Sequence, residues 1–243
     1  MRMLTFARRC FKEILRDPLN LAFGLGFPLV LLLLLSAMQA NIPVPMFEID
    51  HLAPGITVFG LSFITLFSAT LVAKDRESAF LQRLYTTPLR AVDFILGYML
   101  PMIPIAIGQT VICYLVAISL GLTVSANIVY AIIGIIPMAV FYITLGLLCG
   151  SLLGVKQVGG VCGALLTNLS AWLSGVWFET DLLGDTFQTV ACSLPFFHGV
   201  ELERQLVRGD FTDVGVHIFP VVDYGILVSA VAVLCFLRQM KKQ

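Results

Sequence analysis

Long apolar runs, separated by short clusters of charge, constrain the fold of this chain more than any other feature of its sequence. Each run has about 18 residues or more, enough for a helix to cross a hydrocarbon layer about 30 Å thick. The runs are continuous, which excludes a closed barrel, because its strands alternate apolar and polar residues. We therefore predict an all-α polytopic membrane protein with six transmembrane helices. The predicted spans are residues 20–38, 53–73, 94–120, 128–153, 158–178 and 220–237.

The distribution of charge predicts how these spans are oriented. Only 12% of the 243 residues are charged, compared with about 25% in soluble domains. With the N-terminus on the cytoplasmic side, 13 Lys and Arg residues lie inside and 2, Arg204 and Arg208, lie outside. Cytoplasmic loops of membrane proteins carry an excess of basic residues. We therefore predict a multi-pass protein of the cell membrane (inner or plasma) with both termini in the cytoplasm.

We predict a single transmembrane domain over residues 1–243, and two of its segments on the cytoplasmic side do not cross the membrane. Residues 1–18 place apolar side chains on one helical face and basic ones on the other, which predicts an interfacial helix at anionic headgroups. Residues 74–93 form a short charged segment whose middle reads as an amphipathic helix. Pro88 disfavours a helical conformation at Thr87 and predicts where that helix ends.

The outer segment 179–219 is too long for a simple turn and too apolar for a linker. Residues 186–197 are apolar enough to enter the outer leaflet as a re-entrant helix. Residues 198–208 then read as an amphipathic helix at the surface that ends near Gly209.

The sequence contains no motif that would power transport or catalysis by the chain itself. It has no GxxxxGK[ST] motif, and no Gly-Lys dipeptide at all, so a phosphate-binding loop of that class is absent. Ion-coupled carriers place ionisable groups inside their spans. Here the one candidate is Asp223, near the outer end of the sixth span, where the pattern favours a side chain that reaches back to the interface. No His or Cys pattern indicates a hydrolase or a metal site. The driving force must therefore come from a partner, or there is none.

Three stretches, in this order and spacing, resemble the type-2 permeases of ATP-binding-cassette (ABC) exporters, and the resemblance covers essentially the whole chain. The first is Leu15-Arg16-Asp17-Pro18, leading into Phe27-Pro28. The second runs from Lys74 to Gly97 and includes Arg76-Glu77-Ser78, Leu81, Arg83-Leu84 and Thr87-Pro88. The third is Leu194-Pro195-Phe196-Phe197 through Arg204, Leu206-Val207 and Gly209-Asp210. Two positions depart from the family pattern, since Ala79 stands where Gly is frequent and Tyr98 where Lys is common.

The resemblance implies a permease that forms a homodimer, or pairs with a paralogous permease, in the lipid bilayer and docks ABC ATPase subunits. It implies export of a hydrophobic or amphipathic substrate, with ATP and Mg bound by the partner, no cofactor or catalytic residue on this chain, and no nucleic acid. Residues 76–88 would be the coupling helix that fits a cleft on the ATPase. Its candidate contact residues are Arg76, Glu77, Phe80, Leu81, Arg83 and Leu84.

By the same resemblance, the second and fifth spans line the substrate path at the dimer axis. The candidates on the second span are phenylalanines spaced four residues apart, Phe59, Phe63 and Phe67. Those on the fifth span are a hydroxyl stripe with two neighbours, Thr167, Ser170 and Ser174 with Asn168 and Trp172. Plain helix packing is an equally good interpretation, because small and hydroxyl residues also serve as contacts between helices in lipid.

A glycine ridge and two alternative functions complete the interpretation. Gly146, Gly150 and Gly154 form a GxxxGxxxG pattern on the fourth span, which favours close packing within the chain over a dimer contact.

An ion-coupled secondary carrier would move substrate without ATP, and a non-transporting scaffold would show no substrate-dependent stimulation of an ATPase. Both alternatives stay open at this point.

Overall fold

The structure is a computed structural model that describes residues 2–41, 47–78, 91–178 and 184–240. These residues form helices and contain no strand, which confirms the all-α prediction. The helices are α1 (Arg2–Leu15), α2 (Pro18–Leu21), the π-helix η1 (Ala22–Gly26), α3 (Phe27–Asn41), α4 (Ile49–Glu77), α6 (Ala91–Met99), α7 (Met102–Ser119), α8 (Asn127–Leu152), α9 (Val155–Val158), the π-helix η3 (Gly159–Leu166), α10 (Thr167–Leu173), α11 (Asp185–Cys192), α12 (Pro195–Arg208) and α13 (Val214–Met240).

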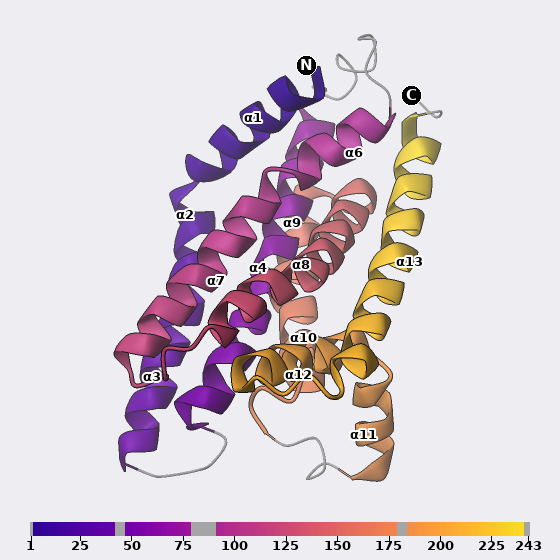
Figure 1. The fold of residues 1–243 in the computed structure, drawn as a ribbon. Helices are drawn as coiled ribbons and strands as arrows, with labels where there is room; N and C mark the ends of the chain where they lie inside the picture. The colour runs from indigo at the N-terminus through magenta and orange to yellow at the C-terminus, as the bar shows by residue number, and fades with distance from the viewer. Residues whose placement is uncertain (1, 42–46, 79–90, 179–183, 241–243) are drawn as a thin grey trace.

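Five helical stretches are long and apolar enough to cross a membrane. They are Ala22–Asn41, Ile49–Glu77, Val92–Ser119, Asn127–Leu152 and Val214–Arg238, and they overlap the predicted first, second, third, fourth and sixth spans. Figure 1 shows them as a bundle with both ends of the chain at the same end of the molecule. The chain is therefore a polytopic helical membrane protein.

The predicted fifth span, 158–178, corresponds to α9, η3 and α10, which is not among these five stretches. Lys156, Gln157 and Asn168 dilute its apolar character. The segment nevertheless follows α4 along most of its length. At one end the Val155 amide donates to Glu77 Oε1 (2.8 Å); at the other, a Cβ on Gly55 would lie 3.3 Å from Val176 Cγ2. A membrane crossing by residues 158–178, and with it the total of six spans, therefore remains a prediction.

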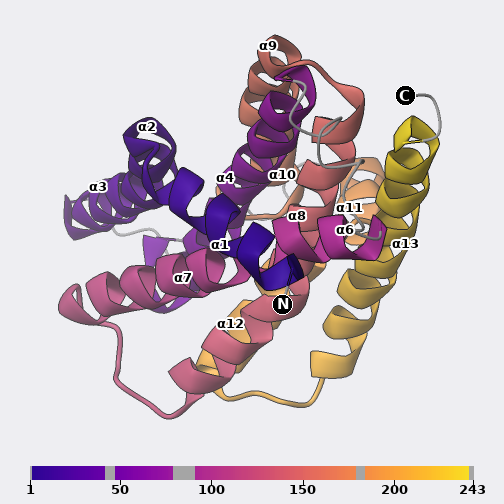
Figure 2. The ribbon, with the colours of Figure 1, turned by 90° about the horizontal axis from the view of Figure 1, so that it is seen from above.

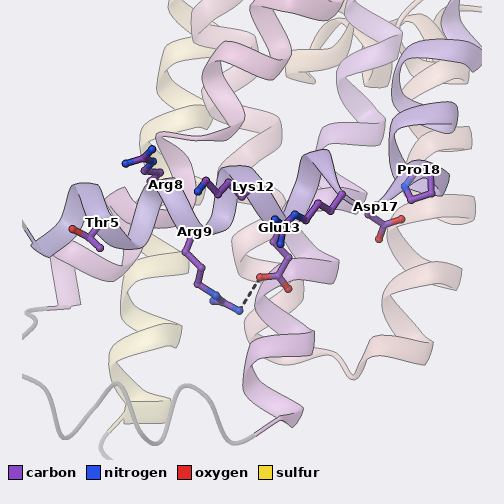
Figure 3. Close-up of a pocket in the computed structure, with 8 residues that line it drawn as sticks. Thr5, Arg8, Arg9, Lys12, Glu13, Asp17 and Pro18 are labelled. Carbon is purple, nitrogen blue, oxygen red and sulfur yellow. Dashed lines mark ion pairs between the residues drawn. The ribbon is translucent and has the colours of Figure 1, made fainter.

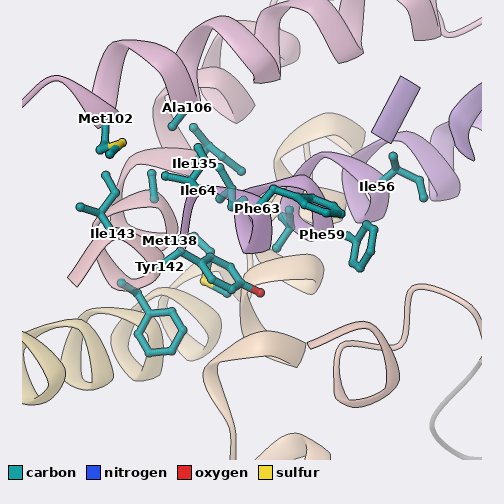
Figure 4. Close-up of a cluster of buried hydrophobic side chains, with 14 of the residues drawn as sticks. Ile56, Phe59, Phe63, Ile64, Met102, Ala106, Ile135, Met138, Tyr142 and Ile143 are labelled. Atoms are coloured by element: carbon teal, nitrogen blue, oxygen red, sulfur yellow. The ribbon is translucent and has the colours of Figure 1, made fainter. Parts of the chain in front are cut away.

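Helix α4 lies at the centre of the bundle, and most of its residues are buried. Figure 4 shows Ile56, Phe59, Phe63 and Ile64 of α4 within the hydrophobic core. Its closest neighbour is α8, because glycines bring the two backbones together: a Cβ on Gly146 would lie 2.5 Å from Thr65 O, and one on Gly150 2.5 Å from Ala69 O. Thr65 Oγ1 also donates to Tyr142 O of α8 (2.8 Å). The intramolecular interpretation of the glycine ridge is confirmed for Gly146 and Gly150.

The segment predicted to lie on the outer side, residues 179–219, divides at another place than predicted. The break falls before Pro195, a residue that suits the first turn of a helix, rather than between residues 197 and 198. Helix α12 ends at Gly209 as predicted, with φ at 76°. Helix α12 lies across the bundle (Figure 1), and its polar Glu203 and Arg204 are buried with partners inside the protein. Its place at the membrane surface remains a prediction.

Helix α1 lies across the end of the bundle where the termini are found (Figures 1 and 2). Its apolar face packs against protein, since Phe6 forms edge-to-face contacts with Phe94 and Tyr98, with ring centroids 5.9 and 4.9 Å apart. Cys10 and Ile14 on the same face are buried. The bundle therefore covers part of the apolar side of α1, whereas Leu4 and Leu15 on that side remain exposed.

Candidate functional site

An apolar groove of about 580 Å³ lies between the first span, α4 and the η3–α10 segment. Aromatic rings supply much of its lining, and none of the described residues that line it is charged. The lining consists of Phe23, Phe27, Leu31, Phe59, Phe63, Leu66, Gly159, Gly163, Ala164, Thr167, Asn168, Ala171, Trp172 and Trp177. This composition suits an apolar ligand oriented by a few polar groups.

The structure brings five of the eight predicted path residues together at this groove: Phe59, Phe63, Thr167, Asn168 and Trp172. The rings of Phe59 and Phe63 meet edge to face, with centroids 5.9 Å apart. Asn168 Nδ2 donates to Ala164 O (2.8 Å), which orients the amide. Trp172 is half exposed.

Phe67, Ser170 and Ser174 do not line the groove. Phe67 packs on the backbone at Gly24, where a Cβ would collide with its ring. The Ser170 hydroxyl bonds to the Tyr142 hydroxyl of α8, and Ser174 Oγ is buried and donates to Ala171 O (3.2 Å). The predicted hydroxyl stripe is therefore divided, because Ser170 and Ser174 face the protein interior whereas Thr167 lines the groove.

Sequence reasoning missed the contribution of the first span and of Trp177. Phe27 lies against Phe63, with ring centroids 5.3 Å apart, and Trp177 lies against Phe59 at 5.6 Å. The signal for the first span was present, since Phe23, Phe27 and Leu31 repeat every four residues like the phenylalanines of α4. No comparable pattern pointed to Trp177, which lies beyond the end of α10.

At the end of α4 that lies on the same side of the bundle as the chain termini, two of the predicted coupling residues contact the start of the groove wall. Arg76 donates to the carbonyl oxygens of Ser151 and Leu153, the latter at 2.6 Å, and Glu77 accepts from the Val155 amide. These bonds fix the turn between α8 and α9, which leads directly into η3. The other four coupling residues, Phe80, Leu81, Arg83 and Leu84, lie outside the described residues.

Immediately before Arg76 on α4, Asp75 binds α1 to the bundle. Its buried carboxylate accepts hydrogen bonds from both terminal nitrogens of Arg9 (2.7 Å each) and from the Tyr98 hydroxyl (2.8 Å). Arg9 also pairs with Glu13 at 2.7 Å (Figure 3). Burial opposes the charge of Arg9, but the hydrogen bond and the charge of Asp75 outweigh it and raise the pKa of Arg9. The end of α4, α6 and α1 therefore form one connected cluster.

The polar side of α1, including Arg9 and Glu13, lines a cleft of about 860 Å³. In Figure 3, Arg8 and Lys12 point to one side of the helix while Arg9 turns toward Glu13. Arg16, Asp17 and Pro18 complete one end of the cleft and Thr5 the other. This basic surface lies on the termini side of the bundle, as do Asp75 and the end of α4 that precedes residues 79–90.

At the other end of the bundle, Arg204 of α12 connects the walls of the groove. Its Nη2 donates to Gly175 O (3.0 Å) just after α10, and its Nε donates to His51 O (3.3 Å) in the first turn of α4. Its Nη1 is paired with Glu201 at 2.6 Å. A single buried guanidinium therefore fastens α12, α4 and the end of the η3–α10 wall to one another.

Comparisons with known proteins agree with this architecture. No curated protein matches the chain. A family model described as "ABC-2 type transporter" matches residues 1–207, which include the first span, α4, the groove and nearly all of α12. Because that match covers most of the chain, the protein belongs to the ABC-2 type transporter family and is a membrane permease of that family.

Proposed function

We propose that this chain is the permease subunit of an ABC exporter that moves a hydrophobic or amphipathic compound with energy from a separate ATPase subunit. The observation that carries the proposal is the uncharged aromatic groove along α4. Phenylalanine and tryptophan faces suit an apolar or aromatic ligand, and also a cation of diffuse charge. The single orienting amide of Asn168 suits a ligand with one polar end.

A conformational change in the ATPase would reach the groove through the coupling segment and the end of α4. We infer from the sequence that residues 76–88 dock the ATPase, with Phe80, Leu81 and Leu84 as anchors. Residues Arg76 and Glu77 are bonded to the turn that begins the η3 wall. A displacement of the docked segment would therefore reach the groove through two short hydrogen-bonded contacts.

Intrinsic fluorescence offers a direct test of the groove. The chain has only two tryptophans, and both line it. We expect ethidium, an aromatic cation, to quench the emission of the purified protein saturably. Replacing Trp172 with alanine should weaken ethidium binding about tenfold, equivalent to about 1.4 kcal/mol, because one aromatic wall is lost. Binding is followed by the fluorescence of the dye itself.

The matched control is Leu169→Ala, an exposed residue of the same helix that does not line the groove. Ethidium should bind this variant as it binds the wild type. Equal loss of binding in both variants, or no saturable quenching of the wild type, would remove the groove from the proposal.

Docking of the ATPase is tested by Leu84→Asp. An unpaired carboxylate in a buried apolar contact has a high free-energy cost. The variant should therefore reach the membrane in normal amounts but export little substrate. ATP hydrolysis by its complex with the ATPase should no longer be stimulated by substrate. Leu84→Met preserves the volume and should retain export. Normal export by Leu84→Asp would overturn the assignment of residues 76–88 as the coupling helix.

A further inference from the structure

Glu203 of α12 is a buried carboxyl group that has no function in the description so far. It is 1% exposed. Its Oε2 accepts a hydrogen bond from the Tyr114 hydroxyl of α7 (2.8 Å). Its Oε1 has no hydrogen-bond partner among the described residues. A carboxylate with one neutral donor is poorly compensated for the loss of water.

The surroundings of Glu203 are apolar and tightly packed. A Cβ on Gly134 of α8 would lie 3.5 Å from Glu203 Oε1 and would collide with Leu206 of α12. Gly199 approaches α8 in the same way, since a Cβ there would lie 2.8 Å from Met138 Sδ. The two glycines let α12 lie directly on α8, which leaves little room for solvent at the carboxyl group.

The other titratable groups on and around α12 interact with partners other than Glu203. Arg204 is bonded to Glu201, His51 O and Gly175 O on another side of α12. On α13, His217 interacts with His198, Glu201 and Asp213. On α4, His51 interacts with Arg204, Arg208 and Glu201. Among the described residues, Tyr114 is thus the one titratable group that acts on Glu203.

We propose that Glu203 is a proton-binding site whose occupancy is linked to the seating of α12 against α7 and α8. Binding converts the carboxylate and a proton from solvent into a neutral carboxyl group, with the proton on Oε1 and the Tyr114 hydroxyl still donating to Oε2. When α12 moves away, water reaches the group and the proton returns to solvent. Burial raises the pKa of Glu203 to about 8, although the Tyr114 hydrogen bond lowers it in part.

The linkage has a definite sign. A solvated Glu has a pKa of about 4.3, whereas the seated residue holds its proton up to about pH 8. Between these two values only the seated form is protonated, so seating weakens by about tenfold for each unit of rising pH. Since Arg204 on the same helix fastens the outer ends of the groove walls, alkaline conditions would loosen that end of the groove and acidic conditions would hold it closed.

Infrared difference spectroscopy on the purified full-length protein tests the site itself. The carbonyl band of a protonated carboxyl group should be present at neutral pH and should titrate away near pH 8. It should be missing from Glu203→Gln, which still accepts from Tyr114, and present in Glu201→Gln, the matched control on the same helix. Tyr114→Phe should move the titration to higher pH. A wild-type protein without the band, or a band that survives in Glu203→Gln, would overturn the proposal.

Thermal unfolding tests the link to α12. From about pH 5 to about pH 8 the wild-type midpoint should fall as pH rises, because the folded form retains a proton that the unfolded form loses. Glu203→Gln should remove that part of the slope, and Glu201→Gln should keep it. An unchanged slope in Glu203→Gln would overturn the link. Neither measurement requires an ATPase or a substrate, so failure here is distinguishable from failure of the proposed export function.

Discussion

Replacing Gly150 with alanine is expected to force α8 away from α4 and to lower the stability of the protein by about 1–3 kcal/mol, the usual cost of overpacking a core. The new Cβ would lie 2.5 Å from Ala69 O and 2.9 Å from Ala69 Cα. These are backbone atoms, so no side-chain rotation relieves the collision and the helices themselves must separate. The midpoint of thermal unfolding in detergent measures the effect.

Gly108 of α7 provides the matched control. It is also a glycine inside a membrane-spanning helix, but a Cβ there would meet nothing within 4 Å. Gly108→Ala should leave the midpoint unchanged or raise it slightly, since alanine favours a helix more than glycine does. If Gly150→Ala unfolded at the same temperature as the wild type, the backbone contact between α4 and α8 would be disproved.

Replacing Asp75 with alanine is the second change for which we expect a large effect. It removes three hydrogen bonds, two from Arg9 and one from Tyr98. The Tyr98 hydroxyl is then buried without its acceptor, at a cost of about 1–3 kcal/mol. The loss from Arg9 is smaller because its side chain is 36% exposed to solvent. We expect a lower unfolding midpoint together with the release of α1 from the bundle.

Release of α1 can be measured as faster proteolysis near Arg8 and Arg9. The control is Lys74→Ala, the neighbouring residue on α4, whose exposed pair with Asp17 is 3.4 Å long. Such a pair contributes about 0–1 kcal/mol, so this variant should resemble the wild type. Equal proteolysis in the Asp75 variant and the wild type would show that the Asp75 cluster does not hold α1.

Hydropathy and charge were sufficient to predict the helical class and the approximate position of five spans, because those runs are apolar along almost their whole length. They were less informative for α9, η3 and α10. There the segment includes Lys156, Gln157 and Asn168, and its course along α4 depends on contacts at Glu77 and Gly55 that no periodicity reveals. The burial of α12 was missed for a related reason: Glu203 and Arg204 look like surface residues until their partners on other helices are known.

The candidate site was predictable where one helix face determines it. Phe59 and Phe63 reach the groove because their spacing keeps them on one side of α4, whereas Phe67, one turn further, meets Gly24 instead. Ser170 was assigned to the same stripe as Thr167, but its partner is the Tyr142 hydroxyl of α8. Such outcomes depend on which neighbour lies opposite, and that neighbour is far away in the sequence.

The close approach of α4 and α8 has a mechanical consequence. Two helices whose backbones are in contact cannot slide past each other without first separating, so we expect α4 and α8 to move as one rigid body. Deformation then has to be absorbed elsewhere, and η3 is suited to absorb it. Its turns are wider than those of an α-helix, and Gly159 and Gly160 at its start have open space where a side chain would be. The groove therefore has a rigid wall, α4, and a more deformable wall, η3. We expect its width to change through η3 while both walls stay folded.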